Sequence, residues 1–408
     1  MTAPHRLSGL GFACESAGAH AGAQAVALAR SQLDAEPGFA LLFCGGKHDP
    51  DAVLQGARSV CGQIPIVGGS AVGLISASKA MQTGFECGAL LLAGALSPQT
   101  IVRVAGLDHD EHKTGHQLGV ELRAHGVTPD AVVLLFYDSV RNAAPLVINA
   151  GSRLLEGLHQ GLGEVVPTLV GAGLLCDLVW SCSHIFDGEQ VSKQAVVAVV
   201  MPSMLTCHQA VTHGCYPASD FMTITALAGA RILELDGQPA LDVAAARLGR
   251  SRDALAAINP ALLALTIGEQ RAAPFTPFRD QDYVNRLVMA ADADSGALII
   301  TEADFDIGSR VQLMAVDPQR MIDSAQTQAQ AILNALGDQQ PLFALYIDCA
   351  GRSMVFTGLD EDESEPIRTL IGARCPLLGF FSGVEIAAIA GQARPLDWTG
   401  VILIFFVK

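Results

Sequence analysis

Short apolar runs bounded by glycine or proline recur along the chain. Runs of roughly four to eight such residues are typical of strands in sheets that helices cover. Three segments repeat one pattern: a strand, a helix, a strand that begins at proline and ends in glycine, a turn, and another strand. Their strands are 39–46, 65–73 and 88–94 in the first segment, 131–139, 167–173 and 195–201 in the second, and 342–351, 376–383 and 400–407 in the third. Helices are predicted near 50–61, 145–159 and 363–373.

A different pattern separates the second and third copies. Residues 223–249 alternate, turn at Asp236-Gly237 and become helical from about 239, which predicts a hairpin feeding a helix. Strands near 284–290, 296–301 and 309–315 and an amphipathic helix over 317–336 follow.

The sequence therefore predicts an α/β (α+β) protein with two domains of mixed sheets flanked by helices. Two copies of the repeated unit form the N-terminal domain, 1–205, and one copy lies in the C-terminal domain, 223–408. Residues 206–222 are expected to connect the two domains.

Glycines fall at matching places where the middle strand of each copy ends: Gly68 with Gly69, Gly171 with Gly173, and Gly379. Glycine there allows a positive φ or a close backbone approach, either in a sharp turn or beside a ligand. A turn alone explains the glycines, and we prefer that interpretation. On the ligand interpretation, Gly68, Gly69, Ser70 and Gly171 would offer backbone N–H groups to an anionic ligand.

Charge narrows the range of partners. The 408 residues include 41 acidic and 25 basic side chains, a formal net charge of -16. Phosphate backbones are repelled by this charge, so neither nucleic acid nor an anionic membrane is an expected partner.

The apolar runs also fall far short of the roughly 20 residues that a membrane helix needs, and the first residues lack the apolar core of a secretory signal. A cytoplasmic location is expected. Ten cysteines show no regular framework, and most are expected to be reduced, buried thiols. Self-association into a homo-oligomer is also compatible with the sequence.

Six motifs in order resemble the FIST proteins, which carry a FIST N and a FIST C domain. They are VGGSAVGLIS (67–76), LVGAGLLCDL (169–178), HGCYPAS (213–219), ITALAGARILELDGQPAL (224–241), DCAGR (348–352) and GFFSGVEI (379–386). The last one departs from the usual Gly-Glu-Ile by reading Gly383-Val384-Glu385-Ile386, which keeps the carboxylate and shifts the glycine.

The resemblance implies a sensory module that binds small ligands such as amino acids and signals to a separate histidine kinase or cyclase. A subset of the family resembles haem-binding nitric-oxide sensors that regulate a histidine kinase. No kinase, cyclase or helix-turn-helix motif follows in this sequence, so the output is expected to pass to another protein.

A zwitterionic amino acid needs a cation and an anion close together, and Arg352 and Glu385 supply them at the ends of two adjacent predicted strands. Ser382, Cys349 and Asp348 would line the same rim. The structural alternative is that Arg352 and Glu385 pair with each other.

The best haem candidate is LTCHQAVTHGCYP (205–217). If this segment is extended, Cys207, His213 and Cys215 share one face, with His213 as the preferred iron ligand. The alternative is a strand whose cysteines pack in the core and whose histidines are exposed. Paired Cys-x-x-Cys, the usual mark of a structural zinc site, is absent here.

Weaker chemical signals remain. His109, His112 and His116 lie in an acidic stretch, with His112 and His116 four apart. Cys182 and His184 share a strand face without a third ligand, and Cys375-Pro376 resembles a haem-regulatory dipeptide. Residues 68–73, GGSAVG, match neither a P-loop nor a nucleophile elbow, so no catalysis is inferred from them. The alternative from a different class is an enzyme using Cys349 as a thiolate, because the nearby guanidinium of Arg352 would lower the pKa of the thiol.

Overall fold

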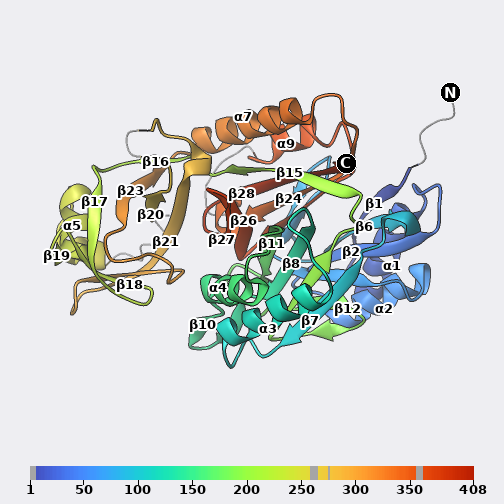
Figure 1. Ribbon diagram of the computed structural model, residues 1–408, viewed down its shortest axis with the longest axis horizontal. Coiled ribbons are helices and arrows are strands. Elements are labelled where there is room, and N and C mark those ends of the chain that lie inside the picture. Colours follow the sequence, from blue (N-terminus) through green and yellow to red (C-terminus); the bar gives the residue numbers. More distant parts are fainter. Residues whose placement is uncertain (1–5, 258–264, 274–275, 355–361) are drawn as a thin grey trace.

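Three six-stranded mixed sheets and a small barrel make up the protein (Figure 1). The computed structural model describes residues 6–257, 265–273, 276–354 and 362–408. The mixed α/β class, the repeated unit and the presence of two copies before the third are confirmed.

The three large sheets share one strand order. Each joins four strands from one copy of the repeat to a hairpin from another copy. The first sheet is β1 (Ser8–Cys14), β6 (Glu86–Ala93), β2 (Pro37–Gly45), β3 (Ile66–Ala71), β12 (Ile185–Gly188) and β13 (Val191–Ser192). The second is β7 (Thr100–Ala105), β14 (Ala195–Val200), β8 (Val132–Asp138), β11 (Thr168–Leu174), β26 (Val384–Ile389) and β27 (Gln392–Leu396). The third is β15 (Leu205–Thr212), β28 (Gly400–Val407), β24 (Pro341–Cys349), β25 (Leu377–Ser382), β4 (Gly73–Ile75) and β5 (Ala80–Met81).

The exchange of hairpins runs in a closed cycle. The second copy gives β12 and β13 to the sheet of the first copy, the third gives β26 and β27 to that of the second, and the first gives β4 and β5 to that of the third. Sheet pairing thus crosses the expected linker 206–222, which itself contributes β15 and β16 (Cys215–Pro217). The sequence indicated the repeat but not this exchange, because the residues of an exchanged hairpin have the same local pattern as a hairpin that pairs within its own copy.

Helices cover the outer faces of the three sheets (Figure 1). α1 (Gly18–Arg30) and α2 (Pro50–Cys61) flank the first, α3 (Glu111–Ala124) and α4 (Gly151–Leu162) the second, and α7 (Pro318–Leu336) and α9 (Glu365–Leu370) the third. The predicted second helix begins later than expected because residues 140–148 form a hairpin of β9 (Val140–Ala143) and β10 (Leu146–Ile148). The described residues contain no helix that is long and apolar enough to cross a membrane.

The inner faces of the three sheets meet in one core. Phe43 of β2, Phe136 of β8 and Phe380 of β25 are fully buried there. The rings of Phe43 and Phe380 stack with centroids 4.0 Å apart, and Phe136 meets Phe43 edge-on at 5.5 Å. Each sheet therefore contributes to a shared aromatic centre.

The barrel inserts between the second and third copies. Its closed ring follows the order β23 (Arg310–Val316), β17 (Met222–Ala228), β18 (Arg231–Leu235), β22 (Ala297–Ile300), β21 (Tyr283–Asp292), β20 (Thr266–Gln270) and back to β23. β16 pairs with β23 and β19 (Gln238–Pro239) with β18, while α5 (Ala240–Arg247) and α6 (Arg252–Ala256) pack alongside. The predicted turn at Asp236-Gly237, the helix and the meander are present. That turn joins β18 only to the short β19, whereas the long hairpin of β17 and β18 turns earlier, at Gly229-Ala230, and the sequence did not predict this turn or the closure of the barrel.

The repeated glycines lie inside strands β3, β11 and β25, so the turn interpretation is corrected. Gly171 has φ 157°, and a Cβ atom on it would lie 1.8 Å from the carbonyl oxygen of Leu135 on β8. On β3, a Cβ on Gly68 would lie 2.1 Å from the carbonyl oxygen of Leu42. These glycines allow close approach of the paired parallel strands.

Gly171→Ala is expected to lower the free energy of unfolding by about 3 kcal/mol or more, because the added methyl group meets backbone that cannot move away. Urea unfolding measures the loss. Gly94→Ala is the control, since the nearest atom to its Cβ is 3.7 Å away, and it should change stability by less than about 0.5 kcal/mol. Equal stabilities of the two variants would contradict the steric explanation.

Candidate functional site

A cavity of about 260 Å³ lies where the ends of β11 and β24 and the crossing from β25 to β26 face the barrel. Its wall combines apolar side chains, two carboxylates and a thiol. The lining residues are Ile148, Leu175, Leu178, Trp180, Leu287, Met289, Thr301, Glu302, Cys349, Ala350, Gly351, Ser382, Gly383, Val384, Asp397 and Trp398. Strand ends that meet at one edge are a common place for ligands, as the sequence predicted.

Two chain crossings build much of this wall. Ser382, Gly383 and Val384 carry the chain from β25 to β26, and the segment 175–184 carries it from β11 to β12. Gly383 donates its N–H to the carbonyl of Gly173 at 2.9 Å, which anchors the first crossing. The cavity is therefore a product of the exchange of hairpins.

Both tryptophans of the chain, Trp180 and Trp398, line the cavity. Each has a positive φ, 59° and 58° respectively, which is unusual for a bulky side chain and concentrates at functional sites. The indole Nε1 of Trp398 is buried and has no hydrogen-bond partner in the described part of the chain. Sequence reasoning missed these residues, although their rarity was visible.

Glu302 and Asp397 place carboxyl groups in the wall, and both are buried. Glu302 accepts hydrogen bonds from the N–H groups of Gly151 and Ser152 at 3.0 and 2.9 Å, at the first turn of α4. Burial raises the pKa of Glu302 to about 7, against the opposing charge of Arg286. Burial also raises the pKa of Asp397, which accepts a hydrogen bond from the Thr301 hydroxyl.

Cys349 and Ser382, both predicted from sequence, line the cavity together. Burial raises the pKa of the Cys349 thiol well above its ordinary value, and the charge of Glu385 adds to this effect. The expected activation by Arg352 is therefore corrected: the surroundings of Cys349 favour the neutral thiol, a poor nucleophile.

Arg352 lies behind the wall and is fully bonded to protein groups. Its Nε lies 3.1 Å from Asp348 Oδ1 and 2.8 Å from Glu363 Oε1, and its Nη1 donates to the carbonyls of His213 and Trp398 at 2.8 and 3.0 Å. The guanidinium is 1% exposed and does not line the cavity. It positions Trp398 instead of gripping a ligand carboxylate, so the structure differs from the expectation for this residue.

Glu385 also lies just behind the lining. Its two carboxylate oxygens accept hydrogen bonds from the hydroxyls of Ser382 and Thr399 at 2.8 and 2.9 Å. Burial raises its pKa to about 8. The suggested structural pair of Arg352 with Glu385 is replaced by the contacts of Arg352 with Asp348 and Glu363.

The glycine-rich segment of β3 lies away from the cavity. Gly68, Gly69 and Ser70 all pair with β2. On the other side Gly68 and Gly69 pair with β12, and the N–H of Ser70 donates to the carbonyl of His184, just before β12, at 3.0 Å. Gly171 pairs with β8 and β26. These residues are not brought to the same place as Cys349 and Ser382.

The haem candidates do not form a haem site. His213 is fully buried, its Nε2 lies 3.2 Å from the carbonyl of Asp280, and its Nδ1 accepts from the N–H of Cys215 at 2.9 Å. The chain turns at Gly214, with φ 65°, so the segment is not one extended strand: Cys207 lies on β15 and Cys215 on β16. Both ring nitrogens of His213 already have hydrogen-bond partners and the ring is buried, so His213 does not suit the role of an axial haem ligand.

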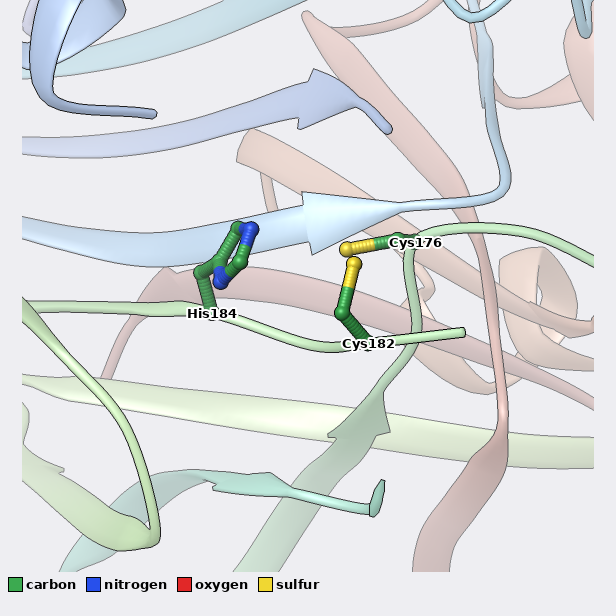
Figure 2. Close-up of side chains that lie close together, drawn as sticks. All are labelled: Cys176, Cys182 and His184. Carbon is green, nitrogen blue, oxygen red and sulfur yellow. The ribbon is translucent and has the colours of Figure 1, made fainter. Parts of the chain in front are cut away.

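One group of side chains brings ligand atoms to metal-binding distance in the described part of the chain. Cys176, Cys182 and His184 have ligand atoms within 4.8 Å of one another. Figure 2 shows the sulfur atoms of Cys176 and Cys182 pointing toward each other, with the imidazole of His184 beside them. Sequence reasoning considered Cys182 with His184 but missed Cys176, six residues earlier. His109, His112 and His116 form no such group.

Comparison with solved structures adds remote similarities. A cyanuric acid hydrolase from A. caulinodans is 11% identical with a TM-score of 0.36, and the alignment covers 98% of this chain and 99% of that one. A chorismatase is 11% identical with a TM-score of 0.31, covering 92% of this chain and 94% of that one. These likenesses are too weak to carry an argument about chemistry. No curated protein matches.

Two family models match this chain. Residues 38–238 match the FIST N domain, and residues 240–388 match the FIST C domain. The two matches span most of the chain and include the cavity residues from Ile148 to Val384. The chain therefore belongs to the FIST family, with a FIST N domain followed by a FIST C domain.

Proposed function

We propose that this protein senses a small molecule with an apolar body and an amine group, bound in the cavity where the second and third sheets face the barrel. FIST domains are sensory, small-ligand-binding domains in signal transduction. The observation that carries the finer proposal is the wall itself, which combines two indole rings with the carboxyl groups of Glu302 and Asp397.

The chemistry of the wall favours a cation. Indole faces attract an ammonium group, and an ionised carboxylate accepts its hydrogen bonds. Among the described lining residues there is no lysine or arginine to hold a ligand carboxylate. At about 260 Å³ the cavity is smaller than the roughly 300–1,000 Å³ of drug-sized sites, so the guest is metabolite-sized.

This proposal modifies the amino-acid expectation. An amino acid would bind through its ammonium group, while its carboxylate would have to rely on backbone N–H groups or water. Amines without a carboxylate fit the wall at least as well. A wider surface groove of about 770 Å³ near Arg103 and Asp187 is less suitable, because these two charges already pair at 2.7 Å.

Ligand binding can change the surface that a partner protein meets, because the barrel and the third sheet both line the cavity. Leu287 and Met289 come from β21 of the barrel, whereas Cys349 and Ser382 come from the third sheet. Buried Arg286 of β21 also donates to the carbonyl of Pro395 at 3.0 Å, beside the same wall. A guest that favours one arrangement of barrel and sheets shifts the population toward it.

The proposed output partner is a separate signalling protein such as a histidine kinase or a cyclase, and the proposed location is the cytoplasm. The ten cysteines, all within the described ranges, form no disulfide, as a reducing compartment favours. Thiol catalysis at Cys349 is not supported, since its environment keeps the thiol neutral.

The ligand class is tested by thermal shift with three matched series: amino acids, the corresponding amines, and the corresponding carboxylic acids. Amines and amino acids should raise the melting temperature, because a ligand that binds only the folded state stabilises it. Glu302→Gln should weaken amine binding about tenfold or more through loss of a charged acceptor. Glu269→Gln, at a buried carboxyl of the barrel outside the cavity, is the control. Binding of the acids alone would overturn the proposal.

Amine affinity should rise as the pH increases from 6 to 8. The carboxyl of Glu302 loses its proton through a pKa of about 7, while an alkylamine stays charged across this range. Calorimetric titration at several pH values measures the effect, which should reach about tenfold. In Glu302→Gln the dependence should be much smaller. Affinity that falls with rising pH would contradict the assignment.

His213→Ala tests the haem alternative. Because the ring of His213 is sealed and both its nitrogens are engaged, this variant should leave a haemin titration of the purified protein unchanged. The Soret band of the wild type and the variant is the measurement. A sharp band that disappears in the variant would establish His213 as an iron ligand.

A further inference from the structure

The segment that carries the chain from β11 to β12 has two faces. On one side Leu175, Leu178 and Trp180 line the cavity. On the other, Cys176, Cys182 and His184 bring two sulfur atoms and an imidazole within 4.8 Å of one another (Figure 2). The cavity does not use this second face.

We propose that Cys176, Cys182 and His184 form a zinc site with three protein ligands and a fourth position open to water or an exogenous ligand. Two thiolates and one imidazole suit a borderline-soft ion, and zinc sites with three protein ligands keep such an open position. Zn–S bonds of about 2.3 Å place two tetrahedral thiolates about 3.8 Å apart, so the ligand atoms are already close to the required separation.

The backbone holds the three residues in place before any metal binds. The N–H of Cys176 donates to the carbonyl of Cys182 at 3.0 Å, which closes the loop between the two cysteines. Inside the loop, Asp177 Oδ1 accepts from the N–H groups of Val179 and Ser181, each at 3.0 Å. The loop therefore loses little conformational freedom on binding an ion.

His184 is fixed to the neighbouring sheet. Its N–H donates to Ser70 Oγ at 3.0 Å, and its carbonyl accepts from the N–H of Ser70 at 3.0 Å. In the described part of the chain its Nδ1 is buried without a hydrogen-bond partner. A buried ring nitrogen without a partner costs stability, and a metal ion bound to the deprotonated nitrogen would satisfy it.

Charge and access also suit zinc. On binding, the two thiols lose their protons to the solvent and form two Zn–S bonds, so the doubly charged ion and the two thiolates sum to zero. A neutral site is compatible with the burial of Cys176. Cys182 and His184 are half-buried, which leaves a path for the ion and for a water in the fourth position. A disulfide between Cys176 and Cys182 would not satisfy the buried Nδ1 of His184, whereas a metal ion would.

The test is a titration of the reduced full-length protein with Zn²⁺ against a chromophoric chelator, repeated with Co²⁺ as a spectroscopic probe. We expect one equivalent of tight binding and a thiolate-to-cobalt charge-transfer band. Cys182→Ser and His184→Ala, both at half-buried positions, should each weaken binding at least about 100-fold, since even outer-shell partners change metal affinity by about 10–100-fold. Melting temperatures of the metal-free variants establish that they fold.

Two controls separate this site from incidental binding. Cys14→Ser removes an exposed thiol, and His116→Ala removes one member of the histidine pair on α3; neither should change the affinity or the charge-transfer band. The proposal is overturned if tight Zn²⁺ binding survives in Cys182→Ser, if it depends on His116, or if the freshly prepared protein contains a Cys176–Cys182 disulfide and takes up no metal after reduction. These outcomes are independent of whether an amine binds in the cavity.

Discussion

Hydrogen bonding at the edges of the three sheets is the constraint on which the rest of the structure depends. The middle strands β3, β11 and β25 would each leave a row of backbone groups unpaired on one side. An exposed edge of this kind invites pairing with other chains. The chain pairs these groups by lending a hairpin from each copy of the repeat to the sheet of another copy, in a cycle that returns to its start. The free edge of each sheet then falls on the outer strand of the hairpin, β13, β27 or β5, of which β5 and β13 are only two residues long.

This solution explains both the core and the cavity. The exchange brings the inner faces together, so that Phe43, Phe136 and Phe380 share one aromatic centre. It also requires the chain to leave one sheet and join another near Gly383 and after Leu174. Such crossings cannot be packed as regular strands, and the space beside them is completed by the barrel. The cavity therefore arises where the closed cycle meets an inserted domain.

Much of the fold could be predicted from the sequence, because strands such as β14 and β28 are continuous apolar runs and α7 has clear helical periodicity after Asp317, which caps it. The partners of β4, β12 and β26 could not be predicted, since pairing between copies leaves no local signal. The sequence predicted Cys349 and Ser382 at a ligand site, and both line the cavity, but it misjudged Arg352. Asp348 lies only four residues before Arg352, whereas the contact with Glu363, eleven residues later, is seen only in the folded chain. Cys176 was missed for a similar reason: its closeness to Cys182 depends on how the loop between them folds back.

The position of the two tryptophans has a practical consequence. Because Trp180 and Trp398 are the only tryptophans in the chain and both border the cavity, the indole fluorescence of the whole protein originates at this one place. Trp180 also belongs to the loop that bears Cys176 and Cys182, whereas Trp398 is held by Arg352 from behind. Replacing either indole by phenylalanine would leave a single emitter, so that the two walls of the cavity could be followed separately in solution without attaching a dye.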